Sequence, residues 1–482
     1  MKTLPGRGAA KDFIVVKVPV ELKGLVEPLE NLIKHAESTA RSMRGRGAVD
    51  YAKVEGEVSA MTGAVECAIH AEHLSKLDVD APMVEIRGKR YALAGRSPGD
   101  YYTRTGAVKV PRSLYRECGP RNAKTVDAIS LRAGVVGRGW LPGTAESMAF
   151  HMQKGTSRDA RETARQDGVL PYSVASFDRV AHLVGERWMQ EHADIEDELI
   201  LELEIPSEAA SISMSMDRVS LPMEEPGKRP AGRPRKNAAK NPITRTYRMA
   251  YCATLTLHDK NGQGIHTIRY GCMPKGDAAG LSAGLSDDVT RLIERRPDLH
   301  VSILADGAPE MWNLLEPYLD PEIAVAHKLV DFYHLIEKLS PAAKVIYGDE
   351  DGRVELARWK RSLLRRSGAA VEILEDLRQS GCEHHKVGIH QPVHDAITYL
   401  ENHSERLNYA HARRNGLPIG SGNVEATCKT LVGIRMKRAG SRWKERTGEH
   451  IIRLRALGLS DRWDSAMDKL HATNRTSVGI AA

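Results

Sequence analysis

The sequence predicts a multidomain α+β protein, in which a mixed β-sheet is interrupted by a helical insertion and preceded by helical modules. The chain has 482 residues, more than one compact core usually holds. Residues 211–334 alternate between strand-like and helix-like patterns, whereas residues 335–415 are helical and polar. The expected parts are an N-terminal helical region (1–80), a β-ribbon with a helix-turn-helix-like region (81–200), a sheet domain in two pieces (201–334 and 416–465), the helical insertion (335–415) and a poorly ordered tail (466–482).

Composition narrows the class of protein. Lys and Arg total 70 against 63 for Asp and Glu, and this modest excess is concentrated in a few segments. The six cysteines form no CxxC pair, which argues against a disulfide framework and a zinc ribbon and favours a reducing cytoplasm. We find no apolar run of signal-peptide or membrane-span length, so a soluble intracellular protein is expected.

The first region is predicted to be helical from about residue 20 to residue 77. Apolar residues recur every three or four positions in two runs. The runs are Leu22, Leu25, Leu29 and Leu32, and then Val58, Met61, Val65 and Ile69. Such stripes pack helices together within one chain or between two chains, and both interpretations stay open.

The second region combines strands and short helices. VEIRGKRYALAG and YYTRTGAVKVP are β-prone and basic, which suits a solvated face or a phosphate-tracking ribbon. Residues 144–188 hold three helical runs, with Ser157 and Ser173 as expected N-caps. A helix-turn-helix that reads the major groove and a plain three-helix unit have the same pattern.

The central region has the element order β-β-β-α-β-α-β. Residues 211–221 alternate as a strand, and two further strands are joined at DKNGQG. A helix, the apolar strand HVSILA, a helix and the strand EIAVAHKLV follow. This order is that of an RNase H-like fold, whose sheet would carry a ligand site at the carboxyl ends of its strands.

Three carboxylates stand at strand ends or helix starts in this region. They are Asp217 within SISMSMDRVSLPM, Asp306 at the end of VSILAD, and Glu425 after GLPIGSGN. Oxygen ligands of this kind suit two Mg²⁺ ions, one activating water or a 3′-hydroxyl and the other stabilising the leaving oxygen. We therefore expect metal-dependent phosphoryl transfer on nucleic acid.

Each carboxylate also has an ordinary explanation. Asp-Gly at a strand end is a common turn, which applies to Asp306. Ser421 or Asn423 could cap a helix that begins before Glu425, and an ion pair with Lys429 would then hold Glu425 on a solvated face. Val424, Cys428 and Leu431 are expected to form the apolar stripe of that helix.

Basic segments flank the acids. PGKRPAGRPRKNAAKNPITRTYR contains eight basic residues and no acid, and its AGRPRK centre is similar to an AT-hook that lies in the minor groove of A·T-rich DNA. A disordered solubilising loop is the alternative. The residues that we expect to contact DNA are Lys228, Arg229, Arg233, Arg235, Lys236, Lys429, Arg435, Lys437, Arg438, Arg442 and Trp443.

The histidine-rich segment CEHHKVGIHQPVH invites a zinc interpretation. Its spacing matches no familiar zinc finger, so solvated helix and turn positions are the expected role of these side chains.

Several segments resemble a known family. DGAPEMWNL, HKLVDFYHL and LPIGSGNVEATCKTLVGIRMKRAGSRWKERTGEHIIRLRAL are similar to bacterial insertion-sequence transposases of the ISKra type, within the DDE/RNase H-like superfamily. The resemblance covers about residues 200–465. Asp331 to His334, DFYH, is similar to the (C/D)xxH motif of hAT and Mutator-like transposases, and it implies that Asp331, His334 and Trp312 lie near the active site. Arg218 departs from the glycine that often follows the first acid.

The resemblance implies a DNA transposase. Asp217, Asp306 and Glu425 would bind two Mg²⁺ ions, with Mn²⁺ as a substitute, and act in cleavage and strand transfer at terminal inverted repeats. The partners would be double-stranded DNA and further copies of the chain, in the cytoplasm at the nucleoid. A transposase-derived DNA-binding protein and an RNase H-like nuclease without strand transfer are the alternatives.

Overall fold

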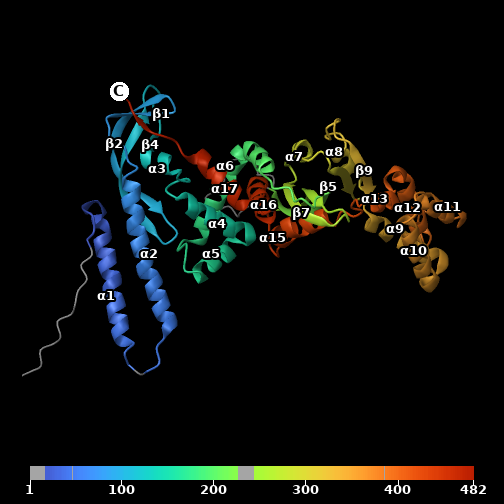
Figure 1. The fold of residues 1–482 in the computed structure, drawn as a ribbon, viewed down its shortest axis with the longest axis horizontal. Coiled ribbons are helices and arrows are strands. Elements are labelled where there is room, and N and C mark those ends of the chain that lie inside the picture. Colours follow the sequence, from blue (N-terminus) through green and yellow to red (C-terminus); the bar gives the residue numbers. More distant parts are fainter. Residues whose placement is uncertain (1–16, 46, 226–243, 385, 482) are drawn as a thin grey trace, which may run out of the picture. The chain divides into compact units, whose positions relative to one another are not determined.

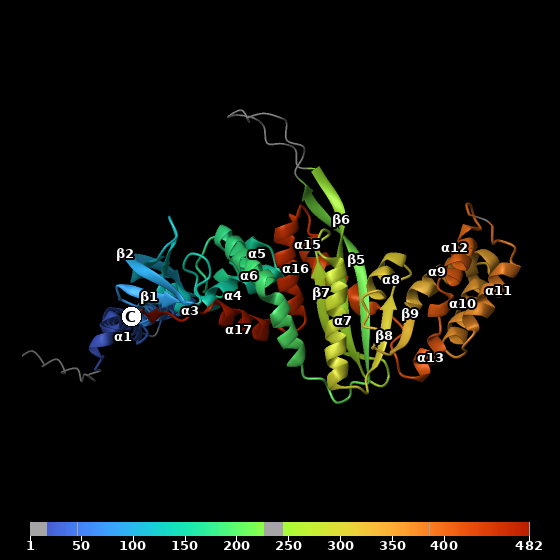
Figure 2. The same cartoon turned by 90° about the horizontal axis from the view of Figure 1, so that it is seen from above.

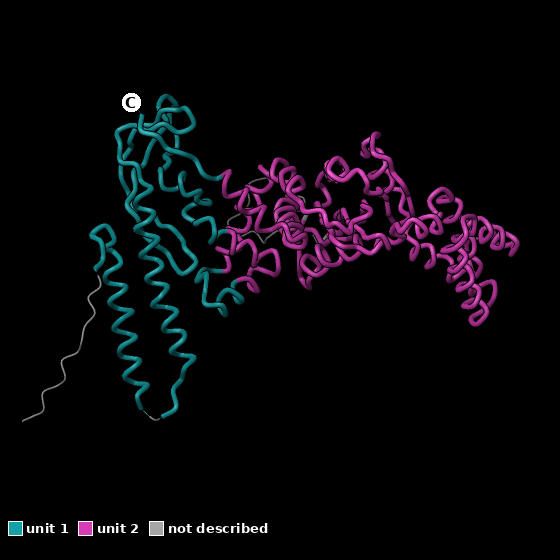
Figure 3. Tube along the Cα trace, in the orientation of Figure 1, with its two compact units in different colours: residues 1–145, 161–173, 474–482 teal, residues 146–160, 174–473 magenta. Residues whose placement is uncertain are grey.

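The computed structural model describes residues 17–45, 47–225, 244–384 and 386–481. The chain forms two compact units, each built from separate stretches of sequence (Figure 3). Unit 1 comprises residues 1–145, 161–173 and 474–482, and unit 2 comprises residues 146–160 and 174–473.

Unit 1 begins with a helical hairpin. A 3-10 helix, Val20–Leu25, leads into α1 (Val26–Ser42), which lies beside α2 (Tyr51–Ser75) (Figure 1). The predicted helices are therefore present. None of the residues of α1 is buried, and Leu74 is the buried residue of α2. The leucine stripe is only partly covered, so the choice between internal packing and self-association stays a prediction.

An antiparallel sheet completes unit 1, in the strand order β10-β1-β2-β3-β4. Tyr101 and Tyr115 are fully buried on it. The elements are β1 (Met83–Ile86), β2 (Lys89–Tyr102), β3 (Ala107–Glu117), β4 (Thr125–Asp127), α3 (Ala128–Ala133) and β10 (Gly479–Ile480).

The three helices predicted between residues 144 and 188 are also present, as α4 (Pro142–Lys154), α5 (Ser157–Gln166) and α6 (Val174–Leu201). The predicted N-cap Ser157 is wrong, because Ser157 is already helical. Thr156 Oγ1 accepts the N–H of Asp159 at 3.2 Å, and Asp159 Oδ2 accepts the N–H of Thr156 at 3.0 Å. This reciprocal capping starts α5 one residue earlier than expected. The helix-turn-helix arrangement stays a prediction.

Unit 2 is built on a mixed sheet in the order β7-β6-β5-β8-β9. β5, β6 and β7 are antiparallel neighbours, whereas β8 runs parallel to β5 and β9 parallel to β8. The element order is the one that the sequence predicts. The elements are β5 (Ser211–Glu225), β6 (Thr244–His258), β7 (Gly264–Cys272), α7 (Ala278–Arg295), β8 (His300–Ala305), α8 (Pro309–Leu315) and β9 (Val325–Val330).

Alternate residues of β5 serve two different cores. Met214 and Met216 are buried in the larger cluster with α7, α8 and β8. Leu221 and Met223 are buried with Val424, Leu431 and other residues of the C-terminal helices. Those helices are α14 (Gly422–Thr427), a π-helix (Cys428–Gly433), α15 (Ile434–Met436) and α16 (Glu445–Leu459). Because strand side chains alternate, Asp217 lies on the face that the C-terminal helices cover.

Residues 335–415 are helical, as predicted, and gather beyond β9 (Figure 2). Trp359 is buried among them and belongs to the larger cluster. The helices are α9 (Phe332–Tyr347), α10 (Asp349–Leu363), α11 (Ala369–Gln379), α12 (Gln391–Asn402), a 3-10 helix (Ser404–Arg406) and α13 (Tyr409–Arg414).

The prediction of a poorly ordered C-terminal tail is wrong. α17 (Trp463–Asn474) buries Trp463, Ala466, Met467 and Leu470, and β10 then pairs with β1. Burial of apolar side chains and a sheet partner order this segment, although its sequence has no long periodic pattern. Across the described parts of the chain, no helix is long and apolar enough to cross a membrane.

Candidate active site

Asp217 and Asp306 lie on neighbouring parallel strands. Met216 of β5 pairs with Ala305 of β8, so the next residue of each strand is an aspartate. Met216 and Ala305 share the larger core, and the alternation of strands turns both aspartates to the opposite face. Two carboxylates from residues far apart in the sequence therefore lie side by side where β8 ends, although β5 continues to Glu225.

Asp217 is half-buried, and its charge is poorly compensated. Burial raises the pKa of its carboxyl, and the nearby charge of Asp306 raises the pKa further. Oδ1 accepts the N–H of Arg218 at 2.6 Å, and the thiol of Cys428 donates to Oδ2 at 3.4 Å. Cys428 begins the π-helix, an irregularity that is frequent at functional sites.

Arg218, which follows Asp217, directs its side chain to another carboxylate. Its guanidinium pairs with Glu310 at the start of α8, and Glu310 also accepts the hydroxyl of Tyr251 at 2.6 Å. The basic side chain therefore adds a link between β5 and α8 on the rim of the site.

Asp306 follows the buried strand β8 directly. Its Oδ1 accepts the N–H of Ala308 at 3.0 Å, and its carbonyl accepts Nε1–H of Trp312 at 3.0 Å. Gly307 is required by a close approach, since a Cβ there would lie 2.4 Å from the ring of Tyr399. The Asp-Gly pair is thus more than a turn signal, because α12 packs directly on it.

Glu425 lies exposed on α14 and pairs with His334 of α9. Its Oε1 is 2.8 Å from His334 Nε2, whereas Nδ1 of the same ring lies 3.3 Å from Glu337. Burial alone lowers the pKa of His334, but the carboxylates of Asp331, Glu425 and Glu337 outweigh burial and raise the pKa above its ordinary value. The raised pKa favours the protonated imidazole, which forms an ion pair with the Glu425 carboxylate.

Asp331 has a structural position. It is 2% exposed, and its Oδ1 accepts the N–H groups of Tyr333 (2.6 Å) and His334 (3.0 Å) as the N-cap of α9. Oδ2 accepts both the N–H and the hydroxyl of Ser421. Ser421 thus bonds Asp331 instead of capping α14, and Asn423 donates to Thr256 at 3.3 Å. Asp331 fastens α9 to the loop before Glu425.

The donor set suits a hard cation such as Mg²⁺, but the three acids are not gathered around one point. Asp217 and Asp306 are carboxylates on adjacent strands, and the desolvated Asp217 would regain compensation for its charge from a cation. In the described ranges, no three His, Cys, Asp or Glu residues are grouped closely enough to hold a metal ion. Glu425 is engaged by His334 instead, so a third ligand requires this ion pair to exchange.

The histidine-rich segment forms internal bonds. Cys382 Sγ lies 3.5 Å from His390 Nδ1, and His394 Nδ1 lies 2.6 Å from the carbonyl of Glu383. These contacts fix the turn before α12.

The residues that the sequence predicts to contact DNA fall into three groups: those outside the described ranges, those that are exposed, and those that bond within the protein. Lys228, Arg229, Arg233, Arg235 and Lys236 lie outside the described residues. Lys429, Lys437 and Arg442 are exposed near α14 and α15, and so is Arg438, which pairs with Asp159.

Arg435 and Trp443 are structural in this arrangement. Arg435 is 4% exposed, donates to the carbonyl of Met152 at 3.1 Å, and lies 5.1 Å from the ring of Trp443. Trp443 in turn donates to the carbonyl of Met436 at 2.8 Å. Burial lowers the pKa of Arg435 to about 10. Neither side chain is free to reach a phosphate.

A cavity of about 570 Å³ opens beside Asp306, between α8 and α12. Trp312, Tyr399 and His403 supply aromatic walls, and Arg406 lies 4.2 Å over the ring of Trp312. The sequence singled out Trp312 only through a resemblance and missed the others, because residues 399–406 read as an ordinary polar helix and loop. Their role depends on packing against a segment about 90 residues away.

Comparison with known proteins gives distant structural similarity to transposases. No protein-family model and no curated protein sequence matches the chain. The Drosophila P element transposase strand transfer complex is 14% identical over 68% of this chain and 79% of that chain, with a TM-score of 0.24. The Mos1 transposase paired-end complex with left transposon end is 12% identical over 56% of this chain and 79% of that chain, with a TM-score of 0.15. TM-scores this low leave the function to be argued from the residues.

Proposed function

We propose that this protein is a DNA transposase of the ISKra type, which binds the terminal inverted repeats of an insertion sequence and catalyses Mg²⁺-dependent cleavage and strand transfer. The observation that carries the proposal is the register of β5 and β8, which sets Asp217 beside Asp306 on one face of the sheet. The strand order β7-β6-β5-β8-β9, with three antiparallel strands followed by two parallel ones, is the order expected for an RNase H-like fold and supports the proposal.

Asp217, Asp306 and Glu425 are the residues that would hold Mg²⁺. The metal would supply activation of water or a 3′-hydroxyl and stabilisation of the leaving oxygen. The chain itself positions the carboxylates: the Cys428 thiol and the Arg218 amide hold Asp217, the Ala308 amide orients Asp306, and His334 pairs with Glu425. The Asp331–Ser421 bonds keep α9 and α14 together, so that His334 reaches Glu425.

DNA contact is proposed at four places. The basic segment of residues 228–236 and the exposed Lys429, Lys437 and Arg442 would bind phosphates, which provide affinity without sequence preference. Residues 81–200 would recognise the element ends. The cavity lined by Trp312 and Arg406, beside Asp306, offers room for a DNA strand where it leaves the candidate active site. Because a transposase joins two DNA ends, we propose a homodimer or larger assembly acting at the nucleoid.

Strand transfer tests the proposal directly. Duplex oligonucleotides that carry the inverted repeat flanking the coding frame, with a free 3′-hydroxyl, are incubated with a supercoiled plasmid and Mg²⁺ or Mn²⁺. We expect the full-length protein to join the two DNAs. Asp306→Asn should lower the rate more than about 100-fold and still bind the repeat, because even outer partners of metal ligands cost about 10–100-fold when replaced.

Asp298→Asn is the matched control, since Asp298 is an exposed acid that pairs with Arg296 just before β8. Wild-type joining by Asp306→Asn would remove this residue from the site. Repeat binding without any cleavage would favour a transposase-derived DNA-binding protein, and cleavage without joining would favour a nuclease.

A further inference from the structure

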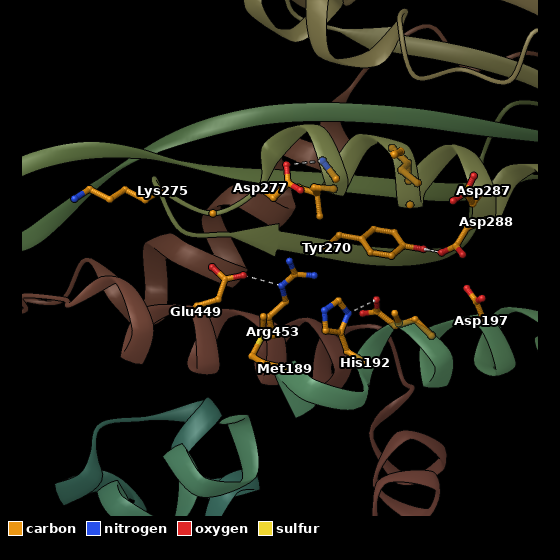
Figure 4. A pocket seen from close by; sticks show the side chains of 18 of the residues that line it. Met189, His192, Asp197, Tyr270, Lys275, Asp277, Asp287, Asp288, Glu449 and Arg453 are labelled. Carbon is orange, nitrogen blue, oxygen red and sulfur yellow. Dashed lines mark hydrogen bonds and ion pairs between the residues drawn. The ribbon is translucent and has the colours of Figure 1, made fainter. Parts of the chain in front are cut away.

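A second, larger cavity lies in unit 2 away from the three acids. Its volume is about 720 Å³, within the range of small-molecule sites, and its walls come from α6, β7, α7 and α16 (Figure 4). Tyr270 of the edge strand β7 points into it, whereas Asp217 lies two strands away on β5. The cavity therefore has no part in the proposed strand transfer.

The floor of this cavity is apolar, and α7 leaves room above it. Leu281 and Leu285 are buried there. Gly280 and Gly284 follow each other at a spacing of one helical turn, and a Cβ at Gly284 would meet nothing within 4 Å. A glycine within a helix lowers stability relative to alanine. Gly284 leaves a strip of helix backbone open to the cavity, whereas at Gly280 the carboxylate of Asp277, which accepts the Gly280 N–H at 2.8 Å, occupies the space that a Cβ would take.

The rim carries an excess of negative charge. Seven acidic side chains line the cavity against four basic ones. Two of the acids and two of the bases pair with each other, Asp197 with Arg291 at 2.8 Å and Glu449 with Arg453 at 2.8 Å, so the remaining lining residues still hold more acids than bases. Asp277, just before α7, and Asp287, within α7, are exposed at the rim.

Asp288 is a buried carboxylate with incomplete compensation. It is 4% exposed and accepts the hydroxyl of Tyr270, while Arg291, whose closest partner is Asp197, lies 3.7 Å from it. Burial raises the pKa of the Asp288 carboxyl to about 6, which shows that the ionised form lacks full compensation for its lost hydration. A buried negative charge beside an aromatic ring at the wall of a cavity is the arrangement that recognises an ammonium ion.

We propose that this cavity binds an organic polycation of the polyamine class, whose ammonium groups are separated by methylene stems. One ammonium group would meet Asp288 and Tyr270, the stem would lie on Leu281 and Leu285 along the glycine strip, and a second ammonium group would reach Asp277 or Asp287. A bare metal ion lacks the apolar stem that the floor would cover. An anion would be repelled by the surplus of carboxylates.

Calorimetric titration of the full-length protein with spermidine, in the absence of DNA and at about 0.15 M ionic strength, tests the proposal. We expect saturable binding. Gly284→Leu should weaken it at least about tenfold by filling the open strip, and Asp288→Asn should weaken it about tenfold by removing the buried charge. Gly56→Leu is the matched control, because Gly56 also lies within a helix and a Cβ there would likewise meet nothing within 4 Å.

Circular dichroism melting of each variant shows whether it is folded. Should Asp288→Asn fail to fold, Tyr270→Phe keeps the ring and its packing and is expected to weaken spermidine binding severalfold. Three outcomes would each overturn the proposal: no saturable binding of spermidine, binding by Gly284→Leu as tight as by the wild type, or displacement of spermidine by Mg²⁺ at concentrations as low as those at which spermidine binds, at matched ionic strength. None of these outcomes bears on strand transfer, which uses other residues.

Discussion

Two neighbouring strand ends in unit 2 carry the same residue in different circumstances. Asp306 follows β8 and Asp331 follows β9, and the two strands are parallel neighbours. Asp331 is 2% exposed, and its oxygens accept four hydrogen bonds, from Tyr333, His334 and Ser421. Asp306 is half-exposed, and one of its oxygens accepts the Ala308 amide. The first carboxylate is saturated, and the second keeps capacity for a ligand.

An acid at a strand end therefore indicates a ligand site only when its oxygens are not already occupied by hydrogen-bond donors of the protein. A carboxylate with four donors gains little from a cation, because its charge is already stabilised by fixed dipoles. Asp217 resembles Asp306 in this respect: burial raises its pKa, and its partners are one backbone N–H and one weak thiol donor. Asp217 and Asp306, which can still accept a ligand, mark the candidate active site, whereas Asp331 is a structural residue beside it.

Replacing Asp331 or Asp306 with alanine should separate the structural role from the ligand-binding role most strongly. Asp331→Ala leaves buried donors of Ser421, Tyr333 and His334 unsatisfied, and we expect it to lower the free energy of unfolding of unit 2 by about 3–5 kcal/mol. Asp306→Ala should change it by less than about 1 kcal/mol. Urea denaturation followed by circular dichroism measures both. Equal losses of stability would abolish the distinction between a saturated and an open carboxylate.

The opposite end of the sheet extends the comparison to pH. His258 is 2% exposed, accepts the hydroxyl of Ser213 on Nε2 at 2.7 Å, and donates from Nδ1 to the carbonyl of Gly262 at 3.2 Å. Burial lowers the pKa of His258 to about 4. Because the folded pKa lies below the unfolded value, this stabilisation is complete above about pH 6.5 and is lost as the pH falls towards 4.

The free energy of unfolding should therefore fall by up to about 3 kcal/mol between pH 6.5 and pH 4 through this residue. His258→Gln, which cannot be protonated in this range, should show a shallower loss. The difference between the two pH profiles is the measurement, because other groups titrate in both proteins. Parallel profiles would show that His258 is not held neutral.

The smallest expected effect concerns the ion pair of Glu425. His334→Gln removes the positive charge but keeps a hydrogen-bond donor, and we expect about a tenfold slower strand transfer with a higher Mg²⁺ requirement. Since the pKa of His334 is raised, wild-type activity should decline as pH rises through that pKa, and the variant should lack this decline. His300→Gln, an exposed histidine at the start of β8, is the control. Unchanged kinetics at every pH would reduce His334 to a surface ion pair.

The sheet of unit 2 and its helices could be predicted from sequence because each strand and helix carries its own period. Alternation along residues 211–221 places Met214 and Met216 on the face opposite Leu221, and the structure buries them in separate cores. The stripe of Val424, Cys428 and Leu431 is likewise buried as expected. Local signals were weaker at boundaries, where Thr156 rather than Ser157 caps α5.

Residue roles that depend on distant partners could not be predicted. Arg435 and Trp443 belong to a strongly basic segment, yet the carbonyl of Met152 takes the guanidinium of Arg435 and the two side chains pack together. The tail after residue 465 becomes ordered because α17 is buried and β10 joins β1. A basic or aperiodic stretch carries no sign of such a partner in its own composition.

The sequence alone predicts the order of strands and helices, the two faces of β5, and the three acids, of which one lies within a strand, one at a strand end and one at a helix start. Only the tertiary structure shows that Asp217 lies beside Asp306, that His334 pairs with Glu425, and that Ser421 donates hydrogen bonds to Asp331. It alone also shows that α6, β7, α7 and α16 enclose an acidic cavity. The physical reason is the distance along the sequence over which each interaction acts. Periodicity and capping act within a few residues, whereas hydrogen-bond saturation and burial are set by groups that are brought together from positions about 90 or more residues apart.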